Sequence, residues 1–198
     1  MSNKEHVMDL IKKNNGIITS REASVVGIDN KVLQRMNLSG EIERIEQGMY
    51  MDPNQIEDGY LIAQYRCRKG IFSHETALYF NDLSDRTPLQ MMLTIPSGYN
   101  TRLLKEKDSY KFFYISEALH PVGVMEMLTP FGNKIRVYDR ERTICDCIRK
   151  KNQLDGDMVT EAIKRYFKTP GADFAKLIEY SKMFKIIDEV RKYIEVLT

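Results

Sequence analysis

Four polar side chains between residues 30 and 35 have the types and the spacing to bind a polyanion. Asn30, Lys31, Gln34 and Arg35 occupy positions i, i+1, i+4 and i+5 of this segment, and on a helix with 3.6 residues per turn they share one side. Amide, ammonium and guanidinium groups donate hydrogen bonds to phosphate oxygens and to the edges of bases. The pattern therefore indicates a surface that contacts nucleic acid.

Two short helices joined by a glycine turn are predicted to position these side chains. Thr19 followed by Glu22 forms a capping box, which predicts a helix that starts there and runs to about residue 26. Gly27 ends it, because glycine adopts the positive φ of a tight turn without steric cost. Asp29 caps a second helix to about residue 39, and Gly40 closes it. This is the pattern of a helix-turn-helix, whose second helix enters the major groove of DNA.

The flanking segments support this interpretation. In the second helix the apolar residues Val32, Leu33 and Met36 share the side opposite the four polar ones. Upstream, residues 4–14 form an amphipathic pattern that predicts a supporting first helix.

A hairpin is predicted after the second helix. Residues 41–46 and 49–51 read as strands around Gln47-Gly48. In a two-residue turn Ile45 and Tyr50 would lie opposite each other, and a slightly longer loop is an equal alternative. The hairpin would be the wing of a winged helix-turn-helix.

The expected contacts to DNA come from three places. The start of the first motif helix exposes backbone N–H groups that favour phosphate, the second helix reads the groove, and the wing adds the rest. The expected DNA-binding residues are Thr19, Ser20, Arg21, Asn30, Lys31, Gln34, Arg35, Arg44 and Gln47.

The charge of this segment favours a different interpretation. Residues 1–52 contain seven Lys and Arg against eight Asp and Glu, a net charge of −1, whereas DNA-binding modules usually carry a basic patch. Three helices and a hairpin also make an ordinary protein-interaction domain. Positive surface must therefore come from segregated charge or from the rest of the chain, whose basic clusters include the possible secondary DNA contacts Arg66, Arg68, Lys69, Arg149, Lys150 and Lys151.

Composition, a polar boundary and the order of the predicted elements indicate a two-domain α+β protein of the cytoplasm. The polar stretch 52–59 separates a first domain, residues 1–52, from a second, residues 60–198. In the second, short strands (89–95, 110–115, 122–128 and 134–138) follow helices at 60–68 and 75–80 and precede helices at 141–150, 156–167 and 172–197. The three cysteines fit a reducing compartment, and neither a secretory signal nor a membrane span is expected.

Catalytic and metal-binding patterns are weak. On a helix Cys145 and Cys147 point about 200° apart, so we interpret both as buried hydrophobic residues rather than metal ligands. His74-Glu75 is interpreted as the start of a helix rather than an acid–base pair. We expect no enzymatic activity, no metal and no cofactor.

The chain resembles the AbiEi family, the antitoxins of bacterial abortive-infection toxin–antitoxin systems. The resemblance spans nearly the whole chain and is carried by the EQGMY that ends the hairpin, by FSHETALYFNDLSDRTP, by LTIP and by YDRERTICDCIRKKNQLD, with residues 73–83 and 139–146 its most specific parts.

The resemblance implies a bifunctional protein. The first domain would repress its own operon by binding double-stranded DNA at inverted repeats in the promoter. The second would neutralise a nucleotidyltransferase toxin without a stable complex. Inverted repeats require two protein copies, either a dimer or two monomers that meet on DNA. Two alternatives remain: a regulator whose second domain senses a small molecule, and a DNA-guided nuclease that uses Asp139, Glu141 and Asp146.

Overall fold

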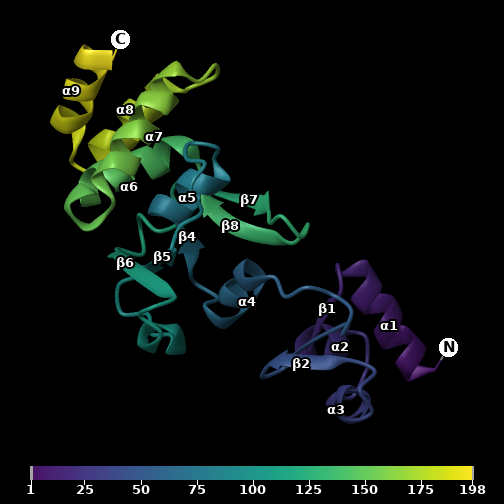
Figure 1. Cartoon of the computed structure of the whole chain (residues 1–198). Coiled ribbons are helices and arrows are strands. Elements are labelled where there is room, and N and C mark those ends of the chain that lie inside the picture. The colour runs from purple at the N-terminus through teal and green to yellow at the C-terminus, as the bar shows by residue number, and fades with distance from the viewer. Residues whose placement is uncertain (1, 198) are drawn as a thin grey trace. The chain divides into compact units, whose positions relative to one another are not determined.

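The computed structural model describes residues 2–197 and has an α+β fold (Figure 1). Contacts divide the chain into two compact units: Met1–Ile62 with Leu128–Lys134, and Ala63–Met127 with Ile135–Thr198. The two units differ from the expected domains, residues 1–52 and 60–198. The main difference is that residues 128–134 belong to the first unit. No helix among the described residues is long and apolar enough to cross a membrane.

The first unit contains three helices and a small sheet within its described residues. They occur in the order α1 (Asn3–Lys13), β1 (Ile17–Thr19), α2 (Ser20–Val25), α3 (Asn30–Leu38), β2 (Glu43–Glu46) and β3 (Met49–Met51). The predicted helices are confirmed, including the capping box of Thr19 with Glu22 and the Asp29 cap. Gly27 and Gly40 have φ values of +80° and +74°, as the predicted turns require.

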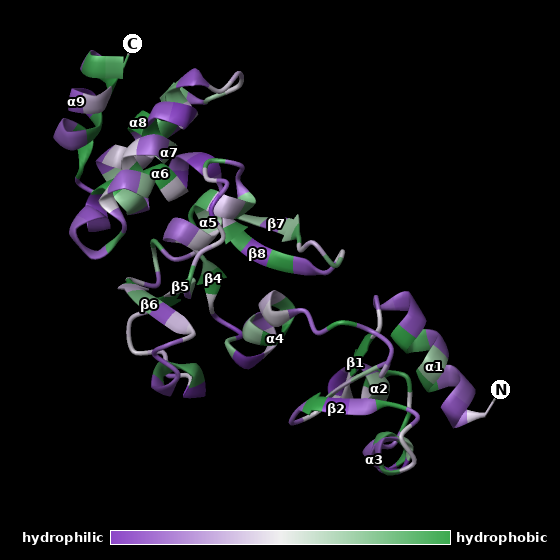
Figure 2. Ribbon diagram, viewed as in Figure 1, coloured by the Kyte–Doolittle hydropathy of each residue, from purple (hydrophilic) through white to green (hydrophobic). Residues whose placement is uncertain are grey.

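A buried core holds these helices together. Val7 and Ile11 of α1 pack with Val32, Leu33 and Met36 of α3. Figure 2 shows hydrophobic turns of α1 set among hydrophilic ones, the pattern of an amphipathic helix. The polar face of α3 must therefore lie on the other side, toward solvent.

The hairpin differs from its prediction in register. Arg44, not Ile45, lies opposite Tyr50, and Glu46 lies opposite Met49. A bulge between Arg44 and Glu46 contains Ile45, so the pair expected between Ile45 and Tyr50 is wrong. Strand β1 was not predicted either; it pairs antiparallel with β3 and makes β3 the central strand.

The second unit is built on a sheet of five strands in the described residues, in the order β6-β5-β4-β8-β7. These strands are β4 (Ile71–Phe72), β5 (Met91–Pro96), β6 (Tyr110–Ile115), β7 (Val124–Leu128) and β8 (Lys134–Tyr138). β5 runs parallel to β6 and antiparallel to β4, while β4 runs parallel to β8. Two-residue β4 was not predicted, although it is the central strand, because a segment that short has no periodicity to detect.

Helices pack into the main core of this unit. They are α5 (His74–Phe80), α6 (Arg140–Lys150), α7 (Gly156–Lys168), α8 (Phe174–Met183) and α9 (Ile187–Leu197). Helix α4 (Gly59–Arg66) spans the division between the units, and two 3-10 turns are η1 (Arg102–Lys105) and η2 (Lys151–Gln153). Leu78, Ile144 and Leu177 are fully buried in this core. The single helix expected over 172–197 is wrong: Lys185, at φ +57°, separates α8 from α9.

A buried carboxylate holds residues 128–134 within the first unit. Asp58 is 1% exposed and its Oδ2 accepts hydrogen bonds from the Thr129 hydroxyl at 2.6 Å and the Asn133 amide at 2.9 Å. Its Oδ1 accepts from the backbone N–H groups of Tyr60 and Leu61. The Asn15 amide donates to the Gly132 carbonyl at 2.9 Å. A segment remote in sequence thus completes the first unit.

Candidate nucleic-acid interface

The exposed side of α3 carries the four polar residues that the sequence analysis brought together. Asn30, Lys31, Gln34 and Arg35 are all exposed, while the opposite side of the helix is buried. Arg35 Nε donates to the Lys31 carbonyl at 3.2 Å, which directs the guanidinium along the helix surface. The structure thus places these four donors on one accessible face.

Asn30 joins this face to α2. The Ser20 hydroxyl donates to Asn30 Oδ1 at 2.8 Å. The bond links the first residues of α2 and α3 and sets the side-chain amide at the start of the exposed face. Ser20 therefore acts on this surface through Asn30.

Thr19, Ser20 and Arg21 differ in what they can offer a phosphate. The Thr19 hydroxyl donates to Glu22 Oε2 at 2.8 Å and accepts from the Glu22 backbone N–H at 3.2 Å. The Ser20 backbone N–H donates to the Gly48 carbonyl at 2.8 Å. Arg21 is exposed and has no ion-pair partner in residues 2–197. Of the three residues, Arg21 is therefore the one whose side chain is exposed and available to bind a phosphate.

The two hairpin residues are also at the surface. The Arg44 backbone N–H donates to Asn37 Oδ1 at 2.8 Å, which ties β2 to α3, and its Nε donates to the Glu46 carbonyl at 3.3 Å. Gln47 is exposed in the turn. The bulge turns Arg44, rather than Ile45, to the position opposite Tyr50.

In the first unit several carboxylates bind backbone N–H groups at helix N-termini rather than basic side chains. Glu5 and Glu22 accept from N-cap backbone N–H groups at 2.7 Å, and Asp29 accepts from the Lys31 N–H at 2.8 Å. These carboxylates complete helix N-termini, where negative charge is favourable. Lys31 and Arg35, in contrast, pair with no carboxylate among the described residues. Residues 1–52 therefore present a cationic α3 face although their net charge is −1.

Three of the six residues in the basic clusters of the second unit make ion pairs, and two of these three lie in the first cluster. Arg66 pairs with Glu106, Lys69 pairs with Glu117 at 3.3 Å, and the Arg68 guanidinium lies 5.8 Å from the centre of the Tyr65 ring.

The other basic cluster lies at the end of α6. Arg149 donates to Asp146 at 3.0 Å. Lys150 and Lys151 make no ion pair within the described part of the chain, and neither does Arg68, so the charges of these three secondary candidates are not paired with a carboxylate.

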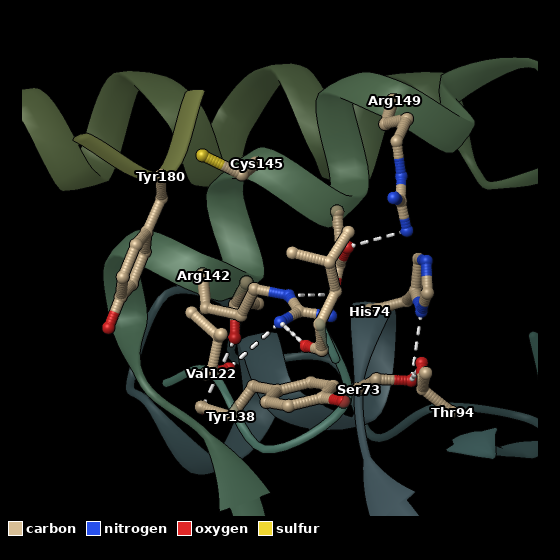
Figure 3. Close-up of polar contacts among 12 residues, drawn as sticks. Ser73, His74, Thr94, Val122, Tyr138, Arg142, Cys145, Arg149 and Tyr180 are labelled. Atoms are coloured by element: carbon tan, nitrogen blue, oxygen red, sulfur yellow. Dashed lines mark hydrogen bonds and ion pairs between the residues drawn. The ribbon is translucent and has the colours of Figure 1, made fainter. Parts of the chain in front are cut away.

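A buried charged cluster lies inside the second unit and was not foreseen as such (Figure 3). Arg142 is fully buried between the rings of Tyr138 and Phe184, whose centres are 4.1 and 4.2 Å from its guanidinium carbon. Its Nε donates to Asp146 at 2.8 Å, and Asp146 also accepts from Arg149. The i, i+4 spacing of Arg142 and Asp146 was the signal in the sequence that could have revealed this pair.

Arg142 also organises the loop before β7. Its Nη1 donates to the carbonyls of Leu119 and Val122 at 2.9 and 2.8 Å. Burial raises the pKa of the Asp146 carboxyl above its usual value, and the two guanidinium groups oppose that shift. The cluster is thus part of the core rather than an accessible site.

His74 lies at the edge of the same cluster. It is fully buried, has φ +50°, and its ring stacks on Phe113 with centres 3.5 Å apart. Its Nδ1 is 2.9 Å from the Ser73 hydroxyl oxygen, to which Thr94 donates. Burial, with Arg149 and Arg142 nearby, holds the pKa of His74 well below its usual value.

Only two of the three acidic residues considered for catalysis lie together. Asp139 and Glu141 line a pocket of about 390 Å³ in the second unit, whereas Asp146 is committed to the buried ion pairs. Lys176 donates to Asp139 at 2.9 Å, and Glu141 accepts from the Tyr166 hydroxyl at 3.1 Å. The described residues contain no group of three or more His, Cys, Asp or Glu that could hold a metal.

The cysteines are where the sequence analysis expected them. Cys145 and Cys147 are buried in α6, and Cys67 is buried as well. Burial raises the pKa of the Cys145 thiol, so it stays protonated.

Comparison with known proteins does not assign a family. No family model matches the chain, and no curated protein matches it. Among solved structures, the chain is similar to the crystal structure of the RV2827C protein from Mycobacterium tuberculosis, with 10% identity and a TM-score of 0.49 over 82% of this chain and 74% of that one.

Proposed function

We propose that the chain is a DNA-binding autorepressor and antitoxin, whose first unit is a winged helix-turn-helix. The observation that carries the DNA-binding half is the α3 face, on which Lys31 and Arg35 are exposed and free of carboxylate partners. The order α1-β1-α2-α3-β2-β3, with β2 and β3 as the wing, supports it. A recognition helix needs exposed hydrogen-bond donors of this kind, and it needs a scaffold that presents them to the DNA groove.

The partners follow from this proposal and from the resemblance to AbiEi antitoxins. The first unit binds double-stranded DNA at inverted repeats in its own promoter, two copies to an operator. The second unit neutralises a nucleotidyltransferase toxin without a stable complex.

The DNA-binding test uses a labelled duplex from the region upstream of the chain's own coding sequence. We expect saturable binding that weakens steeply with salt, and a double variant Lys31→Ala/Arg35→Ala that binds at least tenfold more weakly with a salt slope lower by about two. The matched control, Lys164→Ala/Lys168→Ala, removes two exposed lysines from α7. Equal affinity of the α3 variant and the wild type would refute the assignment of α3.

The antitoxin test is genetic and independent of DNA binding. The gene next to the chain should encode a nucleotidyltransferase that arrests growth when expressed alone. Co-expression of the chain should restore growth, also in the Lys31→Ala/Arg35→Ala form. A neighbouring gene without toxicity would contradict this half of the proposal.

A ligand-responsive regulator is the second candidate, and the pocket of about 390 Å³ favours it. Phe80 and Met125 supply an apolar wall beside Asp139 and Lys176, a mixture typical of small-molecule sites. Thermal shift against a metabolite collection, followed by DNA binding with any stabilising compound, distinguishes this regulator from an antitoxin.

A further inference from the structure

A cationic hollow lies beside the polar face of α3. Lys4 of α1 and Arg35 of α3 line it together with Ser2, Asn3 and Val32, and its volume is about 270 Å³. The end of α1 contributes little by itself, because the capping box already engages the backbone N–H groups of Ser2 and Glu5. The two cationic side chains, which come from different helices, define this hollow.

Arg35 is free to bind an anion there, but Lys4 is not. Lys4 Nζ is 2.5 Å from Glu41 Oε1, and the same oxygen accepts from the Ser39 hydroxyl at 2.6 Å. The Lys4 and Glu41 side chains are 56% and 37% exposed. An ion pair this exposed is weak and exchanges readily.

We propose that the hollow holds a phosphate of the DNA backbone and that Glu41 competes with this phosphate for Lys4. The inference rests on the proposed DNA binding and adds to it a contact from α1 and a residue that limits affinity. A phosphate bound beside Arg35 would accept hydrogen bonds from the Lys4 ammonium in place of Glu41, because the phosphate and the Glu41 carboxylate are both charged acceptors for this donor. Glu41 would then be left without its partner, close to a polyanion.

If Glu41 and a DNA phosphate compete for Lys4, the substitutions Lys4→Gln and Glu41→Gln should change the affinity for DNA in opposite directions. Lys4→Gln removes one phosphate contact, so affinity should fall roughly threefold and the slope of log K against log salt should shrink by about 0.9. Glu41→Gln releases Lys4 and removes a negative charge near DNA, so affinity should rise by roughly threefold. Because phosphate contacts carry no sequence information, both changes should appear equally with a scrambled duplex.

The experiment measures binding of the full chain to the labelled upstream duplex and to its scrambled version from about 50 to 200 mM salt. Lys13→Gln is the matched control, since it removes an exposed lysine from the other end of α1. Thermal melting checks that each variant is folded.

The outcomes are separable. Binding by the wild type with Lys4→Gln equal to Lys13→Gln, or with Glu41→Gln no tighter than the wild type, would overturn this inference and leave the α3 assignment standing. A wild-type chain that binds neither duplex would overturn the proposed function itself.

Discussion

Replacing Asp146 by alanine should strongly destabilise the second unit, and this has consequences for any test of catalysis. The carboxylate is fully buried and accepts from Arg142 at 2.8 Å and Arg149 at 3.0 Å. Removing one partner of a buried ion pair costs about 3–5 kcal/mol, because the other charge stays buried without compensation. Arg142 cannot move to solvent, since Tyr138 and Phe184 enclose it.

The expected magnitude is measurable. In a chain of this size 1 kcal/mol shifts the melting temperature by about 2–4 °C, so Asp146→Ala should lower it by roughly 6–20 °C. Asp146→Asn keeps an acceptor but exchanges charge-assisted hydrogen bonds for neutral ones, a loss of about 1 kcal/mol for each of two bonds. It should therefore be intermediate.

Differential scanning calorimetry and urea titration give the free energy of unfolding. Glu179→Ala, which removes an exposed carboxylate from α8, should stay within about 0.5 kcal/mol of the wild type. A loss below about 1 kcal/mol for Asp146→Ala would refute the reasoning. If the loss is as large as expected, the disappearance of a nuclease activity in this variant says nothing about catalysis, and the folded fraction must be measured beside any cleavage assay.

Two further predictions concern buried polar groups. Because the folded chain holds His74 neutral while the unfolded chain protonates it below a pKa of 6.5, stability should fall as pH drops below about 6.5, by up to about 1.4 kcal/mol per pH unit. His74→Asn, which tolerates the positive φ and does not titrate, should have a shallower slope between about pH 5 and 6.5 in urea titrations. Asp58→Ala leaves Thr129 and Asn133 without their acceptor, so it should destabilise the first unit by about 1–3 kcal/mol, measured by hydrogen exchange.

A specific result would contradict each of the predictions for His74 and Asp58. Identical pH slopes in wild type and His74→Asn would mean that the folded chain accepts the proton at His74. For Asp58, the control is its exposed neighbour Glu57, whose replacement by alanine should change stability by less than about 0.5 kcal/mol. Equal exchange rates in the two variants would show that the buried hydrogen bonds contribute nothing net.

The elements that were predicted correctly are those that depend on local sequence signals. Capping residues, glycine turns and helical periodicity depend on neighbours within about four positions, so α1, α2 and α3 were predicted to within a residue or two. Strand register and short central strands depend on partners far along the chain. The bulge at Ile45 and the strand β4 therefore escaped prediction.

By itself the sequence determined the α+β class, the two short helices around Gly27, and the single exposed face on which Lys31 and Arg35 lie. Only the tertiary structure decided what each charge does. It placed Asp146 against Arg142 in the core, Asp58 against residues 128–134, and Glu41 against Lys4. The reason is physical: periodicity shows which side of a helix is apolar, but the partner of a charge is set by the distance across the folded chain.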